Sequence, residues 1–536
     1  KGDTHMKLRL AALLLAFAAP VLAADMLPTP ARTAAQGAGP YPSLVIRGVT
    51  IIQGDGAPPY GPADIVIEGG RIAAINIAGT PGLPMRPNRK PQGATREIDA
   101  TGMFVLPGFV DMHGHNGDPQ KSPDPSYAYK LWLAHGVTTV RGVSLYDDTA
   151  HALSDKRRSA ANSIVAPHLY VYETLGSGWS KGAVTTPALA REWVQWAAKS
   201  GVDGIKFFNR GDDTPDVEKA AIVEAKRLGL GTVAHLSQPY VGQFNARDAA
   251  AAGLGTITHF YGHFESLLDG RTLQDSPATY NFFDEQARFG GIAEIWDQTY
   301  EPGSPEWKEY LAAQKSTGVT FDPTMTIYSA SRDLMRARNA DWQAEYTVPS
   351  LWDYFQSNRD NHGSYFFDWT TANEVAWRNF YKRYMALVND YKNMGGRVTT
   401  GSDSGFIFQI WGFGYIQEFE LLQEAGFSPL EVIRSATIEG ARTLTDPKGG
   451  APDFGTVRVG QRADLVIAPE NPLQNFKTLY GTGFQRLNPQ TNRLETVGGI
   501  RYTVKDGIVY DAPALLAEVR AQVAAEKAAR GATGAK

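Results

Sequence analysis

The sequence predicts an α/β protein, a (β/α)8 TIM barrel with a small β-sandwich domain built from both chain ends. Short apolar strands alternate with helices over residues 108–454, and strands with an alternating pattern lie before and after that section. The chain has 536 residues, 43% of them hydrophobic, which is enough for a large core. A doubly wound open sheet is the alternative, although no glycine-rich phosphate loop follows the first strand.

The first residues have the pattern of an export signal. Lys1 to His5 resemble a vector remnant, and residues 6–24 then contain a basic start, the apolar run Leu10 to Leu22 and small residues at the end. A membrane-spanning anchor is the alternative, but the apolar run is shorter than the ~20 residues that a spanning helix needs. We therefore expect a signal peptide at 6–24, a periplasmic or secreted protein, and no membrane span after signal removal.

Composition narrows the partners and the chemistry. The net charge is −4 and the chain has no basic stripe, so we expect no nucleic-acid partner. The chain contains no cysteine. It therefore has no disulfide, no cysteine nucleophile and no thiolate ligand, and any metal ion must be bound through nitrogen and oxygen.

The predicted β-sandwich comprises residues 43–107 and 455–512, on either side of the barrel section. A linker rich in Pro, Ala and Gly over 27–42 precedes it. Short strands with alternating apolar and polar residues begin at Leu44, and Gly69-Gly70 supplies a hairpin turn. The same alternating pattern occurs again near the C-terminus. One domain built from both stretches is the simplest way to bury their apolar faces.

The barrel section contains eight strand candidates and several helices between them. The strands are predicted over residues 104–112, 137–140, 168–172, 204–208, 231–235, 255–259, 319–322 and 397–400. The helices are predicted over residues 187–199, 217–228, 246–252, 305–316, 369–392 and 429–444. Eight strands with interleaved helices are the pattern of a closed barrel.

Two segments, near 261–305 and 327–394, exceed what a barrel needs. Six of the eleven tryptophans lie between residues 270 and 395. Aromatic-rich insertions after barrel strands form either the wall of a substrate pocket or a dimer interface, and the sequence favours neither. Residues 513–536 are Ala-rich and charged, which predicts a peripheral helical tail.

Polar side chains lie at the ends of the predicted barrel strands, where the active sites of such barrels are built. His113 and His115 flank Gly114 and project to the same side of a strand, which suits metal chelation. In chain order the full set is His113, His115, Lys206, His235, His259 and Asp403. Each residue alone has a structural interpretation, as a core histidine, a snorkelling lysine or a helix cap. Six together in this order indicate a functional site.

This ordered set resembles the amidohydrolase superfamily, and the resemblance covers nearly the whole chain after the signal. The motifs that carry it are residues 105–115, 136–141, 454–457 and 460–466. Within the superfamily the chain is most similar to the imidazolonepropionase-related branch, which includes exported Xaa-Pro and Xaa-basic dipeptidases and ochratoxin-type amidases.

The resemblance implies a site for two divalent metal ions, usually zinc. His113, His115 and Asp403 would bind the first ion, and His235 and His259 the second. Lys206 would bridge them as N6-carboxylysine, since burial in an apolar strand favours the neutral amine that captures CO2. A metal-activated hydroxide would attack the scissile carbonyl, and Asp403 would transfer its proton to the leaving amine.

Three further residues are weaker candidates for substrate contact. Tyr240 could polarise the substrate carbonyl or serve only in packing. His263 could reach the pocket or lie at the surface, and Arg141 could bind a substrate carboxylate or form a structural ion pair. We interpret Asn116-Gly117-Asp118 as a turn only. Relatives often carry an acidic residue where this chain has Gly142, so contacts inferred from that strand do not transfer.

We therefore expect an exported binuclear metal-dependent amidohydrolase that hydrolyses an amide or peptide bond of a small molecule or short peptide, and that forms a homo-oligomer. One alternative is a lactonase or another ester hydrolase on the same metals. A deaminase would imply a single metal, and a non-catalytic metal-binding barrel is the third class. The sequence does not specify the substrate.

Overall fold

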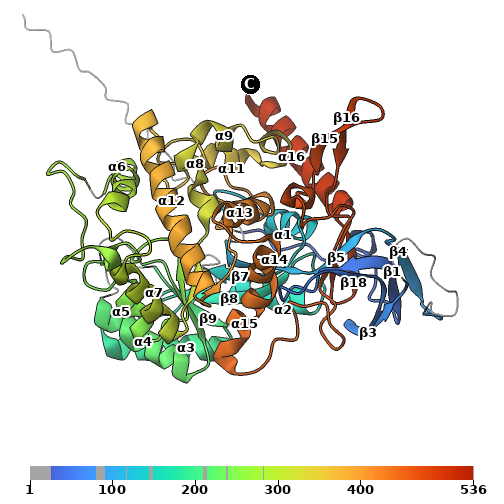
Figure 1. Ribbon diagram of the computed structural model, residues 1–536, viewed down its shortest axis with the longest axis horizontal. Coiled ribbons are helices and arrows are strands. Elements are labelled where there is room, and N and C mark those ends of the chain that lie inside the picture. The colour runs from blue at the N-terminus through green and yellow to red at the C-terminus, as the bar shows by residue number, and fades with distance from the viewer. Residues whose placement is uncertain are drawn as a thin grey trace, which may run out of the picture.

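The computed structural model describes residues 26–79, 91–115, 118–143, 149–208, 214–236, 240–281 and 283–534 (Figure 1). The signal peptide expected at 6–24 lies outside the described residues, as do the first two residues of the turn expected at 116–118. None of the described helices is long and apolar enough to cross a membrane.

A curled parallel sheet of eight strands forms the centre of the molecule. Neighbouring strands pair in chain order, without a switch in strand order. The strands are β6 (Phe109–Gly114), β7 (Val137–Val143), β8 (His168–Thr174), β9 (Gly204–Phe207), β10 (Gly231–Ala234), β11 (Thr256–Thr258), β12 (Thr320–Asp322) and β13 (Arg397–Val398). Seven of the predicted strand positions are confirmed, and the eighth, 104–112, is confirmed only in its second half. The sequential order is that of a barrel and not of a doubly wound sheet.

Backbone hydrogen bonds join the first strand of this sheet to the residues that follow the last. The Met112 N–H donates to the Thr400 carbonyl at 2.9 Å, and the Asp403 N–H donates to the His113 carbonyl at 2.8 Å. The two edges of the sheet therefore meet, which is consistent with the predicted (β/α)8 barrel.

Helices pack around the parallel sheet, most of them where the sequence predicts them. The predicted ones are α3 (Pro187–Ser200), α4 (Pro215–Arg227), α5 (Ala246–Ala251), α7 (Pro305–Thr317), α12 (Thr371–Asn393), α14 (Pro429–Arg434) and α15 (Gly440–Thr445). Four of them have proline in the first turn, and Thr186 and Ser304 cap α3 and α7 by accepting a backbone N–H. The helix predicted over 429–444 is interrupted by a π-helical turn, Ser435–Glu439.

Outside the two insertions, three of the described helices were not predicted from the sequence. They are α1 (Pro125–Ala134), α2 (Thr149–Ala160) and α13 (Phe413–Glu424). Helix α1 is buried almost all round, so it lacks the amphipathic period that indicates a surface helix.

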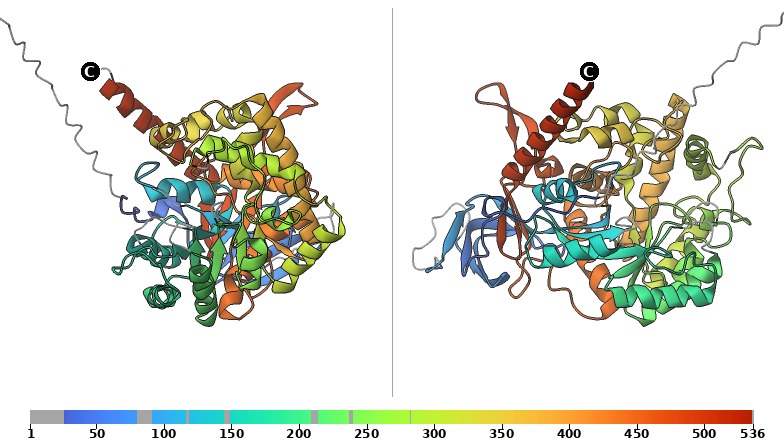
Figure 2. Two further views of the ribbon diagram at one scale, coloured as in Figure 1. Left: turned by 90° about the vertical axis from the view of Figure 1, so that its left-hand side faces the viewer. Right: turned by 180° about the vertical axis from the view of Figure 1, so that it is seen from behind.

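Strands from both chain ends form a second sheet, as predicted, in the order β18-β17-β14-β5-β1-β2-β3 with β4 beside β1. They are β1 (Leu44–Ile51), β2 (Tyr60–Glu68), β3 (Arg71–Ile77), β4 (Arg96–Asp99), β5 (Phe104–Pro107), β14 (Leu465–Ala468), β17 (Tyr502–Lys505) and β18 (Ile508–Asp511). A separate hairpin, β15 (Phe484–Asn488) and β16 (Arg493–Val497), lies near α16 in Figure 1. In the right-hand view of Figure 2 the blue strands and the green helices α3 to α5 lie at opposite ends of the molecule.

The strands of the predicted β-sandwich domain belong to one hydrogen-bonded sheet that folds back on itself. The Ile72 N–H donates to the Gln461 carbonyl and the Ala463 N–H to the Gly70 carbonyl, which brings the β3 edge against the residues that precede β14. Side chains from both chain ends fill one apolar core inside it.

The single strand predicted over 104–112 is wrong, because this stretch contains two strands that belong to different sheets. Strand β5 pairs with β1 and β14 in the second sheet, whereas β6 pairs with β7 in the parallel sheet. Gly108 lies between them, and a Cβ there would come within 2.1 Å of the Thr138 hydroxyl. Periodicity does not reveal such a break, since both strands are apolar.

The predicted tail forms helix α16 (Ala512–Gly534), and its first half is not peripheral. Leu515, Leu516, Val519 and Val523 are buried in the main core. The two insertions, in contrast, provide α6 (Glu285–Ile292), α8 (Ser329–Arg332), α9 (Leu334–Arg338) and α11 (Pro349–Tyr354), which Figure 1 shows gathered at the top of the molecule beside α12.

Candidate metal centre

All six residues proposed as metal ligands lie at the carboxyl end of the parallel strands and line one cavity. His113 is in β6 with His115 just after it, Lys206 is in β9, and His235 and His259 follow β10 and β11 directly. Asp403 lies in the loop after β13. The cavity has a volume of about 590 Å³, and all six side chains contribute to its wall.

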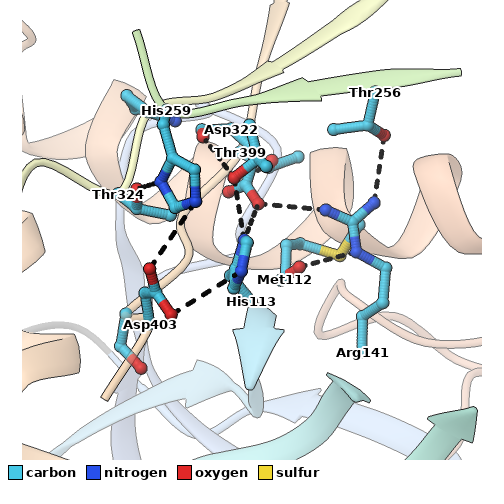
Figure 3. A network of polar contacts seen from close by, with 12 residues as sticks. Met112, His113, Arg141, Thr256, His259, Asp322, Thr324, Thr399 and Asp403 are labelled. Carbon is cyan, nitrogen blue, oxygen red and sulfur yellow. Dashed lines mark hydrogen bonds and ion pairs between the residues drawn. The ribbon is translucent and has the colours of Figure 1, made fainter. Parts of the chain in front are cut away.

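Three of these residues bring their ligand atoms together. The candidate ligand atoms of His113, His259 and Asp403 all lie within 4.8 Å of one another. Figure 3 shows the two rings facing the Asp403 carboxylate, with Oδ1 at 3.7 Å from His113 Nε2 and Oδ2 at 3.6 Å from His259 Nε2. His115 Nε2 lies 3.1 Å from Asp403 Oδ1. Neutral imidazole and carboxylate donors are the set that Zn²⁺ and related divalent ions prefer.

Hydrogen bonds to the far side of each ring orient its Nε2 toward the carboxylate. The Thr258 hydroxyl donates to the Asp322 carbonyl at 3.2 Å, so it accepts from His113 Nδ1 at 2.8 Å. This leaves His113 Nε2 with a free lone pair. His259 Nδ1 contacts the Thr324 hydroxyl in the same way. Metal-ligating histidines are commonly oriented by such partners.

The electrostatics of the cavity keep the histidines neutral. Burial lowers the pKa of His113, His235 and His259 well below the usual value, and it also lowers the pKa of His115. A neutral imidazole is the form that binds a metal ion.

Lys206 has an unusual environment for a lysine. Its side chain is buried in β9, and this burial lowers the pKa of the ammonium to about 7, although the Asp403 carboxylate raises it.

His235 is held by its neighbours in the cavity wall. Its ring stacks on Tyr261, with 4.4 Å between centroids, and lies 4.7 Å from the His259 ring.

Asp111 supports the ligands from beneath. Its Oδ1 accepts from the backbone N–H groups of His113 at 3.1 Å and Ser402 at 3.0 Å. Its Oδ2 accepts from the Ser402 hydroxyl at 2.6 Å and from Trp132 Nε1 at 3.0 Å. Burial raises the pKa of this carboxyl to about 7, although those hydrogen bonds lower it. One buried carboxylate thus connects the strand that carries the two histidines to the loop that carries Asp403.

Two of the six candidate ligands, and one residue that orients a ligand, have a strained backbone. His259 and Asp403 have φ angles of 64° and 51°, and Thr324 has 46°, all in the left-handed region that non-glycine residues seldom adopt. Such residues cost on the order of 1–3 kcal/mol each and persist where the surrounding structure fixes them.

The structure places Arg141 below the ligands and not in the cavity wall. Its guanidinium is fully buried and donates to Asp322 Oδ2, the Met112 carbonyl and the Thr256 hydroxyl at 3.0, 2.6 and 3.0 Å (Figure 3). Of the two interpretations of Arg141, the structural ion pair is the one the geometry fits. Asp322 in turn lies 3.7 Å from His113 Nδ1.

The other two weaker candidates also lie away from the cavity wall. His263 is buried, with Nδ1 2.6 Å from the Tyr310 hydroxyl and its ring against Phe321. Tyr240 lies in the turn before α5, where its carbonyl accepts from the N–H groups of Gln243 and Phe244. Neither side chain is part of the wall that contains the metal ligands.

Several residues of the cavity wall were not identified from the sequence. Glu173 is the last residue but one of β8, so the strand-end argument that found Lys206 should also have found it. The others come from the two insertions and from loops, where no periodicity marks them: Asp118, Lys121, Glu285, Arg288, Tyr328, Tyr354, His362 and Phe406. Both insertions therefore contribute to the pocket wall, which was one of the two roles considered for them, the other being a dimer interface.

A second cluster of possible ligands lies elsewhere, between the two sheets. His168 Nε2 is 3.6 Å from Asp464 and 3.3 Å from Asp506. Arg462 Nε donates to Asp464 at 2.6 Å, and Lys505 Nζ lies 3.6 Å from Asp506. Because cations of the chain already pair with both carboxylates, we interpret this cluster as an ion-pair network.

Comparison with known proteins agrees with this site. A model of the amidohydrolase family matches residues 104–509. An allantoinase of Rubrobacter xylanophilus is 30% identical over 220 residues, which is 39% of this chain and 43% of that protein, so less than half of the relative's length is matched.

Solved structures establish the same fold over most of the chain. Bottromycin amidohydrolase has a TM-score of 0.61 at 21% identity and covers 90% of each chain. A Xaa-Pro dipeptidase with bound methionine has a TM-score of 0.57 at 18% identity, over 88% of this chain and 100% of the other. The ochratoxinase of A. niger has a TM-score of 0.53 at 17% identity, over 88% and 96%.

The fold and the cluster of histidine and carboxylate donors define a parallel barrel with a site that can hold a divalent metal ion. This chain belongs to the amidohydrolase family, and its relatives include dipeptidase-like and amidase-like enzymes.

The role of Asp111 is tested by the Asp111→Asn variant. The amide NH2 group of asparagine would face Trp132 Nε1, which can only donate and would lose its acceptor. We expect a loss of about 1–3 kcal/mol in the free energy of unfolding and a metal affinity lower by about 10–100-fold. Denaturant unfolding and metal titration measure the two effects, with the exposed Asp341→Asn as control. Unchanged values in both would contradict the role of Asp111.

Proposed function

We propose that this protein is an exported, binuclear metal-dependent amidohydrolase that cleaves an amide or peptide bond of a small molecule or short peptide. The observation that carries the proposal is the convergence of four neutral histidines, one carboxylate and one buried lysine on a single cavity. Family membership supports metal-dependent hydrolysis, and the signal-like residues 6–24 support export to the periplasm or the medium.

The donor set fits two divalent ions, most simply zinc. His113, His115 and Asp403 would bind one ion, since Asp403 Oδ1 lies 3.7 Å from His113 Nε2 and 3.1 Å from His115 Nε2. His235 and His259 would bind the other, with Lys206 as the bridging ligand in its carboxylated form. A pKa of about 7 gives Lys206 a neutral amine near physiological pH, which is the form that reacts with CO2.

The metal site, Asp403 and the insertions would each have a different role in hydrolysis. Divalent ions bound here would lower the pKa of a water molecule to about 7 and polarise the scissile carbonyl. Asp403 is the group placed to accept the proton of the attacking water on its carboxylate and to transfer it to the nitrogen of the leaving amine. The insertions contribute Ile327, Tyr328 and Tyr354 to the cavity wall, which gives a substrate apolar surface beside the proposed ligands.

A substrate panel tests the proposal. Zinc-reconstituted protein supplied with bicarbonate is assayed on dipeptides, N-acyl amino acids and simple lactones. Release of an amine from the first two classes is the expected result. Cleavage of lactones alone would move the protein to the ester-hydrolase class, and no turnover with metal bound would favour a non-catalytic metal-binding barrel.

Replacement of the bridging residue, Lys206→Ala, removes the only lysine among the six ligands. We expect the metal content to fall from two ions per chain to one or fewer, with loss of most turnover, because the second ion then has only His235 and His259 as protein ligands. Elemental analysis after gel filtration measures the content, and the exposed Lys199→Ala is the control. Full metal occupancy and full activity in Lys206→Ala would rule out a bridge.

The variant Asp403→Asn separates metal binding from proton transfer. The amide keeps an oxygen donor but accepts a proton poorly, so we expect a folded protein with most of its metal and a kcat lower by about 10²–10⁴-fold. Steady-state kinetics on the best substrate of the panel give the answer. A kcat near that of the wild type would show that another group handles the proton.

A further inference from the structure

Lys121 is a buried cation in the cavity wall that the metal centre does not use. It lies in a turn after β6, closed by a bridge between Asp118 and Ser122. Its side chain is 5% exposed, and its Nζ lies 3.2 Å from the centroid of the Phe406 ring and 4.7 Å from that of Tyr354. Aromatic faces attract an ammonium, but they accept none of its three N–H groups as strongly as an oxygen does.

Among the described residues, no oxygen lies at hydrogen-bonding distance from Lys121 Nζ. The nearest carboxylate oxygen is Asp118 Oδ2, at 3.9 Å, which is too far for a hydrogen bond. Burial lowers the pKa of Lys121 to about 7, a sign of how poorly this wall solvates the ammonium. A buried ammonium without close acceptors is costly unless a ligand supplies them.

The charges on the other walls do not cancel this cation. Glu285 lies on the insertion side of the cavity and pairs with other cations there. Its Oε1 lies 2.6 Å from His362 Nδ1 and 3.1 Å from the Arg288 guanidinium. Asp403 faces His113, His115 and His259. Apart from Asp118, no carboxylate of the described cavity wall lies within ion-pair distance of Lys121, so its N–H groups can still bind the oxygens of an anionic ligand.

Lys121 is also close to the reacting centre. The ring of Phe406 contacts the ammonium and, edge to face, the ring of His115, with 5.3 Å between the two centroids. Lys121 and the metal ligand His115 thus lie one aromatic ring apart. In an N-acyl amino acid or a dipeptide, the free carboxylate is attached to the carbon next to the scissile nitrogen, so the group that binds it must lie near the reacting centre.

We propose that Lys121 binds the free carboxylate of the amino acid that leaves on hydrolysis, so that the substrate class is N-acyl amino acids and dipeptides with a free carboxyl end. This inference rests on the proposed amide hydrolysis for the identity of the leaving group. The rings of Phe406 and Tyr354 beside the ammonium favour an apolar or aromatic side chain on that amino acid.

Binding of the leaving group is measured directly, without turnover. The probes are L-phenylalanine and L-phenylalaninol, which differ in the carboxylate, and calorimetry is done on the metal-loaded protein. We expect L-phenylalanine to bind at least about 10-fold more tightly than the alcohol, as one charged hydrogen bond provides. In Lys121→Met this preference should disappear, whereas Lys121→Arg should keep part of it and the exposed Lys308→Met all of it.

The Met side chain keeps the packing against the rings, and the turn itself is held by backbone contacts that the substitution leaves intact. The Lys121 N–H donates to the Asp118 carbonyl at 2.9 Å, and the Ser350 hydroxyl donates to the Lys121 carbonyl at 2.6 Å. An unchanged melting temperature checks this. Equal binding of both probes by the wild type, or a preference that persists in Lys121→Met, would overturn the proposal.

Kinetics separate this inference from the proposed function. On an N-acyl amino acid and its carboxamide, Lys121→Met should raise KM for the acid by about 10-fold or more and leave kcat and the carboxamide unaffected. A loss that is equal for both substrates would assign Lys121 a structural role. If the wild type hydrolyses neither but still prefers L-phenylalanine through Lys121, the hydrolase proposal fails and the carboxylate site remains.

Discussion

The carboxylate of Asp111 fixes the position of the site, because it joins the first parallel strand to the loop after the last. Its two oxygens accept from His113, Ser402 and Trp132, which belong to three different segments. A carboxylate in a fully buried position is costly unless such donors surround it. The same four hydrogen bonds therefore satisfy Asp111, bring the two edges of the sheet together and set Asp403 opposite the histidines.

A second group of buried polar side chains also holds the strand ends and the candidate ligands in position. Arg141 and Asp322 form an ion pair with no exposed side-chain surface, and Asp322 and Thr258 lie behind the His113 ring. Their partners come from different strands, so each contact fixes a strand end relative to its neighbours. The strained backbone at His259 and Asp403 is sustained by this network. Stability and preorganisation thus depend on the same residues.

The covering insertions have a different role from the barrel. The ends of the parallel strands and the residues just after them supply the six candidate ligands. Most of the other aromatic and charged groups of the cavity wall come from segments outside the regular strand–helix pattern. Lys121 and Phe406 lie in loops, and Tyr354 ends α11. This division is common in barrels, where the scaffold holds the chemistry and the loops select the substrate.

The sequence predicted the strands and the candidate ligands for one physical reason: parallel strands carry their functional side chains at one end, so strand position gives site position. It could not separate β5 from β6, because both are apolar and the break at Gly108 depends on a close contact with Thr138. It left Arg141 open, since an arginine at a strand end can point into the cavity or below it. Glu285, His362 and Tyr354 meet in space from distant segments, and no local pattern marks them.

The central claim is that the six residues form one centre for two metal ions. Anomalous X-ray diffraction from crystals of the zinc-loaded protein tests it most directly. The account predicts two peaks, one among His113, His115 and Asp403 and one beside His235 and His259, with added density on Lys206 Nζ. A single peak, or a peak only at the His168, Asp464 and Asp506 cluster, would contradict it.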